Sequence, residues 1–220
     1  MKRICVFISI LFCTISLFAQ ENSADTFSID GVMNACIRLR NAVADNDTLS
    51  IQQSAEDLRS FVIGDFYGLR CKDDTVASLK GHLVFDENFA DSIVSNKDAA
   101  FHHSDEINKR TISMRGQSAD GSILTKTCFV KAGESTKYSF RAKGHQELAV
   151  VAEAGGLVTM KIHVTNSAGL NERHDDTKDV TKGRPHRKTS FELPTNKTNT
   201  VELVVFNCGD NDISFVVISN

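Results

Sequence analysis

Residues 137–142 read KYSFRA and residues 158–164 read VTMKIHV, and in both stretches apolar side chains alternate with polar ones. Successive side chains of a β-strand point to opposite faces, so this alternation predicts two strands that each have one buried and one solvated face. Tyr138 is in phase with Phe140, which places its ring in the expected core, whereas His163 falls on the solvated face.

Further short strands are expected on either side of these two, at residues 123–130, 146–153, 187–193, 200–207 and 212–219. Pairs such as Lys143-Gly144 and Gly155-Gly156 lie between them and are suited to tight turns. Many short strands with no helix between them predict an antiparallel sandwich or barrel. The one long gap, residues 165–185, is expected to be a polar and charged loop.

Residues 29–44 have a helical period instead. Their apolar residues recur every three or four positions, at Val32, Cys36, Leu39 and Val43. One face of the predicted helix is therefore apolar and must be covered.

A second helix is expected after Asp47 or Thr48, whose side chains can cap its first turn. The short link between the two helices predicts an antiparallel hairpin. The apolar stripes of the hairpin need a further partner, and the sheet that follows is the expected one. The pattern is weaker in residues 69–108, where we expect a short strand at 82–85 and a helical turn at 89–94.

Residues 1–19 have the three parts of a secretory signal peptide. Lys2 and Arg3 precede a nearly continuous apolar run over residues 4–18, and Ala19 is the small residue that ends it. The run is too short to span a bilayer comfortably, and an uncleaved membrane anchor is the alternative. We expect cleavage after Ala19 and a secreted or periplasmic mature chain with no transmembrane segment.

The C-terminal half has a recognisable order of turns and apolar strands. It begins with Ala132-Gly133-Glu134 before Tyr138-Ser139-Phe140 and continues with apolar stretches at 148–151, 157–164, 201–207 and 214–218. In this order, residues 123–220 resemble a pre-peptidase C-terminal-type domain. That family consists of jelly-roll β-sandwiches attached to secreted enzymes, so the resemblance implies a jelly roll with a non-catalytic accessory role.

The expected fold class is therefore α+β. Residues 20–105 form a mainly helical N-terminal region that contains the helical hairpin, and residues 106–220 form an antiparallel jelly-roll-like β-sandwich.

The charge balance limits the possible partners. The chain has 25 basic and 28 acidic residues, a net charge of −3, and loss of Lys2 and Arg3 with the leader lowers this to −5. A general nucleic-acid binder needs a strongly basic face, so we expect no nucleic-acid partner. The chain has no Trp, and its tyrosines are Tyr67 and Tyr138, so it offers few aromatic platforms for stacking on sugars.

The sequence contains no nucleophile elbow, no H-E-x-x-H zinc helix, no P-loop and no dinucleotide-binding glycine pattern. We therefore expect a secreted, non-catalytic accessory or binding protein that recognises a protein or a glycan at the cell surface or in the periplasm. A hydrolase with a site between the helical region and the sandwich is one alternative, and a structural subunit is another.

Four of the six cysteines lie beyond the predicted leader: Cys36, Cys71, Cys128 and Cys208. An even number in an exported chain is consistent with two disulfides, and pairing within each region would join Cys36 to Cys71 and Cys128 to Cys208. The alternative, four buried free thiols that pack as small apolar groups, stays open.

The predicted loop at 165–185 contains the best candidate binding site. His174, Asp175, Asp176 and Asp179 lie within six positions, and the three carboxylates could bind a cation. Calcium is the only cofactor that the sequence suggests. The alternative is a solvated turn that is neutralised by flanking Lys and Arg residues.

Three positions resemble the Asp-Ser/Thr-aliphatic acceptor that is used for O-glycosylation of exported proteins in some Gram-negative anaerobes. The predicted acceptors are Thr48, Thr75 and Ser92. The alternative is ordinary helix capping by Asp and Thr.

Overall fold

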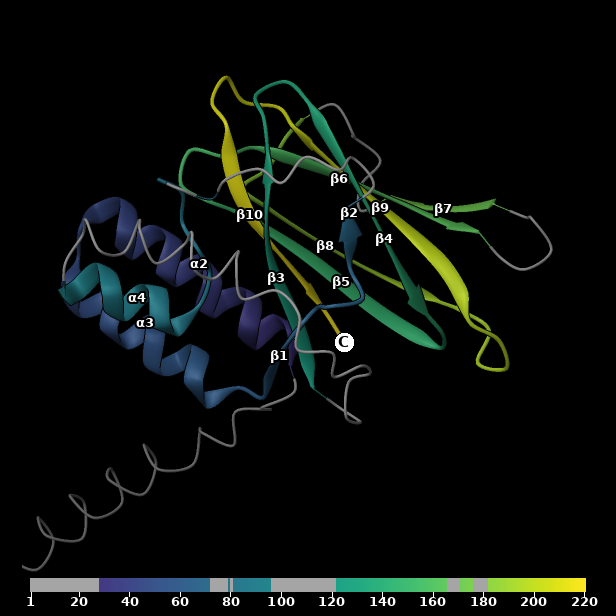
Figure 1. The fold of residues 1–220 in the computed structure, drawn as a ribbon, viewed down its shortest axis with the longest axis horizontal. Helices are drawn as coiled ribbons and strands as arrows, with labels where there is room; N and C mark the ends of the chain where they lie inside the picture. Colours follow the sequence, from purple (N-terminus) through teal and green to yellow (C-terminus); the bar gives the residue numbers. More distant parts are fainter. Residues whose placement is uncertain (1–27, 72–78, 80, 96–121, 166–170, 176–181) are drawn as a thin grey trace, which may run out of the picture.

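The computed structural model describes residues 28–71, 79, 81–95, 122–165, 171–175 and 182–220. Within them three helices and two five-stranded sheets form three layers (Figure 1). The helices are α2 (Ile29–Asp45), α3 (Thr48–Ser60) and α4 (Glu87–Ser95). Sheet A has, in spatial order, β1 (Ile63–Asp65), β3 (Ile123–Val130), β10 (Ile213–Ser219), β5 (His145–Ala152) and β8 (His186–Glu192). Sheet B has β2 (Arg70–Cys71), β4 (Ser135–Ala142), β9 (Asn199–Asn207), β6 (Val158–Thr165) and β7 (Asn171–Asp175).

The eight strands from β3 to β10 form a jelly roll. Counted in chain order, they lie as 1-8-3-6 in sheet A and 2-7-4-5 in sheet B, and all their pairings are antiparallel. The predicted α+β class with a jelly-roll-like sandwich is therefore confirmed. The seven strands expected from the sequence begin and end within about two residues of their predicted bounds.

Sheet A is the middle layer, and its central strands are buried on both faces. Alternate residues of β5 and β10, such as Leu148 and Phe215, belong to the core between the two sheets. The residues between them, such as Val151 and Val216, belong to a second core between sheet A and the helices. This is why both strands have almost continuous apolar sequences instead of the alternation seen in β4.

The helical hairpin forms as expected and covers sheet A. The Ser28 hydroxyl accepts a hydrogen bond from Gly31 N (3.3 Å) at the start of α2. Asn46 ends the helix in the left-handed region (φ 54°), and the Asp47 carboxylate then caps α3 through the backbone N–H groups of Leu49 and Ser50. The predicted apolar stripe of α2 is buried against β5 and β10, so the sheet is the partner that the hairpin required.

The chain crosses between the layers directly after α3. Strand β1 pairs in parallel with β3 of sheet A, and β2, which begins five residues after β1 ends, pairs with β4 of sheet B. The segment before the predicted boundary at residues 105 and 106 thus supplies an edge strand to each sheet. The boundary itself lies outside the described residues, so the division of the chain there stays a prediction.

Two local predictions are wrong. Residues 82–85 do not form a strand, because side chains rather than a neighbouring strand satisfy their backbone: Leu83 N donates to Glu153 (3.0 Å) and Phe85 N donates to Thr127 (3.2 Å). The interval 165–185 is not one continuous loop, since Asn171–Asp175 pairs with β6 as strand β7. By contrast, the helical turn predicted at 89–94 is confirmed as part of α4.

The predicted disulfides are absent, and all four described cysteines are free thiols. Cys36 lies in the core between the helices and sheet A, whereas Cys71 lies on an edge strand of sheet B, beyond the middle layer. Cys128 faces the core between the sheets from β3, whereas Cys208 follows the end of β9. Burial raises the pKa of the Cys36 thiol and that of the Cys128 thiol to about 12.

The predicted leader, residues 1–19, lies outside the described residues. In the part of the chain that is described, no helix has both the length and the apolar character needed to cross a bilayer.

The core between the helices and sheet A is expected to stabilise the fold strongly. Leu39→Ala, at a side chain with 0% exposure, should lower the free energy of unfolding by about 2–5 kcal/mol because it leaves a cavity in that core. Leu49→Ala is the matched control, since Leu49 is 77% exposed, and it should change the value by less than about 0.5 kcal/mol. Urea unfolding measures both, and equal effects would contradict this packing.

The thiols should differ in reactivity with an aromatic disulfide reagent. Exposed Cys71 should react in the native protein, whereas Cys36 and Cys128 should react only on unfolding, because they are buried and their thiolate forms are scarce. Cys71→Ser should remove the fastest phase. An unreduced, unfolded mature chain with no titratable thiol would show instead that two disulfides form.

Candidate functional site

The outer face of sheet B is the candidate functional surface. The inward side chains of its strands, such as Phe140 and Ile162, are buried in the sandwich core. Of the outward ones, Lys137 and Arg141 are exposed, and Phe206 remains 39% exposed although it is a large aromatic. Helices cover the corresponding face of sheet A, so the two outer faces of the sandwich differ.

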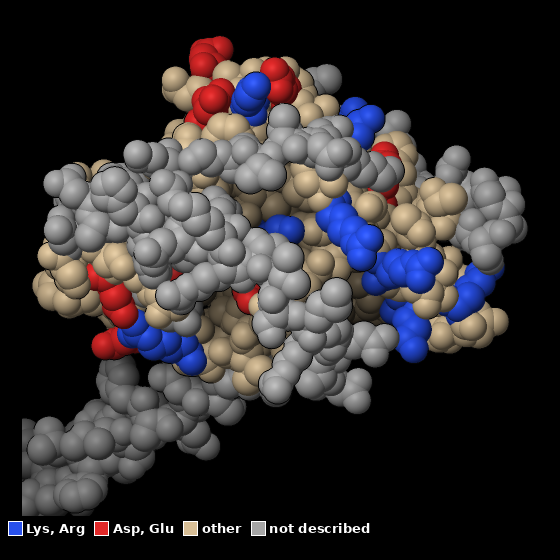
Figure 2. Space-filling view, viewed as in Figure 1, with Lys and Arg blue, Asp and Glu red and all other residues tan. Residues whose placement is uncertain are grey.

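Basic side chains predominate on this sheet-B face. On β2, β4, β9 and β6, strand register and alternation place six charged or titratable residues there: Arg70, Lys137, Arg141, Lys161, His163 and Glu202. Figure 2 shows Lys and Arg gathered over the part of the molecule where β2 and β4 lie in Figure 1. Because the whole chain has a net charge of −3, this local excess of positive charge sets the face apart.

The register also sets the spacing of the charges. Val204 of β9 pairs with Lys137 of β4 on one side and with Lys161 of β6 on the other. The backbones of the two lysines are therefore two interstrand spacings apart, about 10 Å. Ser139 and Thr200 lie in neighbouring positions of the same face and add hydroxyl groups. The face therefore presents separated cations with hydrogen-bonding groups between them.

The site predicted from the sequence lies at the edge of this sheet. His174 and Asp175 are on β7, in register with Ile162 and Lys161 of β6. Asp176 and Asp179 lie outside the described residues. The structure thus brings Asp175 next to a lysine position, and the calcium site stays a prediction.

The predicted glycosylation sites lie on different elements. Thr48 is the exposed first residue of α3, directly after the capping Asp47, and Ser92 lies on α4, where its hydroxyl donates to Asn88 O (2.9 Å). Thr75 lies outside the described residues. Helix capping accounts for Asp47, the Asp that precedes Thr48, and O-glycosylation stays a prediction.

A cavity of about 310 Å³ lies between the helices and the end of β5. Val43, Ile51 and Phe89 form apolar walls from the three helices, while Arg40 and Glu153 contribute charged groups. No sequence pattern described above predicts this cavity. The available signal was Arg40 itself, since it lies four residues after Cys36 and three before Val43 on an otherwise apolar stripe.

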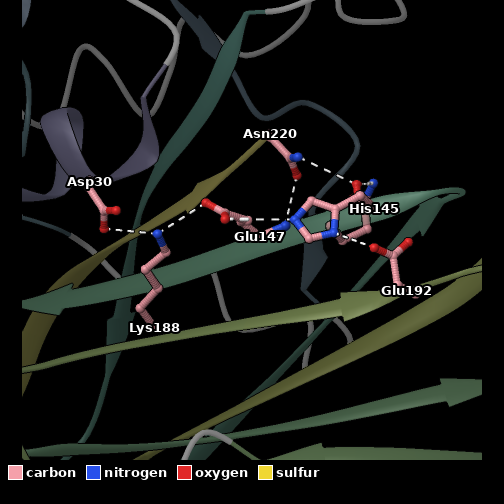
Figure 3. Close-up of polar contacts among 7 residues, drawn as sticks. Asp30, His145, Glu147, Lys188, Glu192 and Asn220 are labelled. Atoms are coloured by element: carbon pink, nitrogen blue, oxygen red, sulfur yellow. Dashed lines mark hydrogen bonds and ion pairs between the residues drawn. The ribbon is translucent and has the colours of Figure 1, made fainter. Parts of the chain in front are cut away.

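A charged network links α2 to β5 and β8 at the edge of sheet A (Figure 3). Lys188 Nζ lies 2.9 Å from Asp30 Oδ1 on α2 and 3.1 Å from Glu147 Oε2 on β5. His145 Nδ1 lies 2.7 Å from Glu192 Oε1, and this hydrogen bond raises the pKa of His145. Asp30, His145 and Glu192 are each more than half exposed, so these ion pairs contribute little stability.

A more buried contact holds the loop at residues 81–85 against the sandwich. Glu153 Oε1 lies 2.7 Å from His82 Nδ1 and accepts from Ser214 N (2.8 Å), while Oε2 accepts from Leu83 N (3.0 Å). The hydrogen bond to Glu153 raises the pKa of His82, although partial burial opposes this. The imidazole also packs edge-on against Phe129, with ring centroids 5.0 Å apart.

No protein-family model matches this chain, and neither does any curated protein. Solved structures do match. A mitogen derived from Yersinia pseudotuberculosis matches 45% of this chain and 85% of its own, at 9% identity and a TM-score of 0.35. The pre-peptidase C-terminal domain of collagenase from Bacillus anthracis matches 44% of this chain and 88% of its own, at 15% identity and a TM-score of 0.33. A periplasmic inhibitor of g-type lysozyme from Aeromonas hydrophila matches 48% of this chain and 91% of its own, at 12% identity and a TM-score of 0.28.

At these identities and scores the likeness concerns the fold alone. The pre-peptidase C-terminal-type sandwich named from the sequence is among the matching structures. The jelly-roll assignment of this chain rests on its own strand order.

The contact between His82 and Glu153 should make stability depend on pH. Because the pKa of His82 is raised in the folded state, its contribution should be complete below the ordinary histidine pKa of about 6.5 and lost as the pH rises through the folded value. Urea unfolding of wild type and His82→Gln from about pH 5 to about pH 9 measures this as a difference. The difference should shrink with rising pH, and a constant difference would contradict it.

Proposed function

We propose that this protein is an exported, non-catalytic binding protein that holds an anionic polysaccharide on the outer face of sheet B. One observation carries the proposal. The helices bury the outer face of sheet A, whereas the outer face of sheet B is accessible and carries Arg70, Lys137, Arg141 and Lys161.

The signal-peptide pattern of residues 1–19 supports export, which would bring the protein to the envelope or its exterior. Acidic polysaccharides occur there as extended, repeating chains. An accessible sheet face that carries several separated cations suits such a ligand better than a deep cleft would.

The recognition is proposed to be ionic rather than based on stacking. The chain has no Trp, and Tyr138 is buried in the sandwich core, so among the described residues Phe206 is the one partly exposed aromatic on the outer face of sheet B. A single partly exposed ring is a poor platform for the stacking of successive sugar rings. Arg70 and Arg141 can instead each offer a planar guanidinium to a carboxylate. The hydroxyls of Ser139 and Thr200 are suited to sugar hydroxyls.

Nucleic acid fits this surface less well. Duplex DNA carries one charge per about 1.7 Å of its axis and is held by dense basic clusters, whereas Lys137 and Lys161 are about 10 Å apart. The net charge, −3 for the whole chain and −5 without the predicted leader, would also repel a long polyanion of high charge density. A polysaccharide with one carboxylate per sugar is less densely charged.

Binding to polygalacturonate and to neutral dextran tests the proposal. The wild-type protein should bind polygalacturonate, should bind it more weakly at high salt, and should not bind dextran. The triple variant Lys137→Gln/Arg141→Gln/Lys161→Gln should bind about tenfold more weakly, since exposed ion pairs contribute about 0.5 kcal/mol each. Isothermal titration calorimetry measures these affinities.

The matched control is Lys131→Gln/Lys143→Gln/Lys197→Gln, which removes the same charge from positions outside the strands of sheet B. It should bind almost as the wild type does. Equal weakening in the two triple variants would mean that only net charge matters, and equal binding to dextran would exclude an ionic ligand.

A further inference from the structure

We propose that the cavity between the three helices and sheet A binds a small amphiphile, with an apolar body inside the cavity and a carboxylate on Arg40. This site is separate from the sheet-B face, and the inference does not depend on the function proposed for that face.

The cavity has the size and lining of a small-molecule site. Its volume of about 310 Å³ is at the lower end of the range for ligand pockets, about 300–1,000 Å³. Each of the three helices contributes apolar side chains to the lining: Val43 from α2, Ile51 from α3, and Phe89 and Ile93 from α4. The loop at residues 81–85 adds Leu83. Since all three helices take part, the cavity belongs to the way in which the helices pack together.

Arg40 supplies the reason to expect an anion. Its side chain is only 8% exposed, yet its hydrogen bonds go to neutral oxygens, from Nε to Asn41 Oδ1 (3.0 Å) and from Nη1 to Pro185 O (3.3 Å). Among the described residues no carboxylate lies within ion-pair distance of it. A buried charge is expensive unless it is paired, and a guanidinium has five N–H donors in a fork that matches a carboxylate.

The other groups near Arg40 are consistent with an anionic ligand. Glu153 also lines the cavity, but its two oxygens already accept from Ser214 N and Leu83 N and contact His82, so protein donors compensate its charge. His186, next to Pro185, has a lowered pKa through burial and then through the positive charges of Arg40, Arg184 and Arg187. The end of β8 beside Arg40 is thus an electropositive environment.

These observations select the chemistry of the occupant. The apolar walls favour an aliphatic or aromatic body, and Arg40 favours an anionic head over a neutral or cationic one. A medium-chain carboxylate combines the two features.

Titration with sodium decanoate tests the proposal, with 1-decanol as the neutral probe of equal chain length. Decanoate should bind saturably to the full-length mature protein and raise its melting temperature as its concentration passes the Kd. Arg40→Met keeps an unbranched apolar side chain but removes the charge, so it should weaken decanoate binding about tenfold, to the level of decanol. Arg38→Met is the matched control, because Arg38 is on the same helix but pairs with Asp57 at the surface, and it should bind as wild type.

Two further measurements keep the test decisive if Arg40→Met folds poorly. First, Ile93→Trp should fill the cavity and abolish binding of both probes. Second, decanoate should raise the pKa of His186 in the wild type, because its carboxylate offsets the positive charge of Arg40, and NMR can follow this pKa. Absence of saturable binding to the wild type, equal affinities for decanoate and decanol, or an unchanged affinity in Arg40→Met would each overturn the proposal.

Discussion

Five consecutive residues of β5, an inner strand of sheet A, are all buried: Leu148, Ala149, Val150, Val151 and Ala152. This strand therefore needs an apolar partner on each face of the sheet. Sheet B covers one face and the helical hairpin covers the other. Neither layer can be removed without exposing a face of sheet A to water. The helical region and the sandwich therefore share sheet A as the wall between their two cores.

This shared wall makes the molecule asymmetric, and its candidate functions follow from the asymmetry. The helices occupy the outer face of sheet A, so sheet B offers the accessible face of the jelly roll and carries the basic residues. The helices also leave a cavity over the end of β5. The buried side chain of Arg40, on α2, is part of its lining. The sheet-B face is a solvated surface, where salt screens the interactions of its charges. The helical cavity is partly enclosed, so the cost of removing Arg40 from water matters most there.

Local hydrogen bonding explains where sequence patterns failed. Residues 82–85 have the apolar composition of a strand, but Glu153 and Thr127 satisfy two of the backbone N–H groups there, so no neighbouring strand forms. Conversely, β7 has the sequence Asn-Glu-Arg-His-Asp, which has little intrinsic preference for a strand. It pairs with β6 because β6 presents a free edge, and charged residues are common on edge strands since they discourage aggregation.

The sequence by itself determined the α+β class, the helical hairpin and seven of the strands, because periodicity records which side chains must leave water and at what spacing. It could also indicate that the hairpin packs on the sheet, since the apolar stripe of α2 had no other partner. Only the tertiary structure decided which face of the sandwich stays accessible, where Arg40 lies and in which layer each of the four free cysteines lies. Those properties depend on strand order and on the packing of the layers, which bring together residues that are far apart in the chain. Contacts of this kind produce no periodic pattern in the sequence.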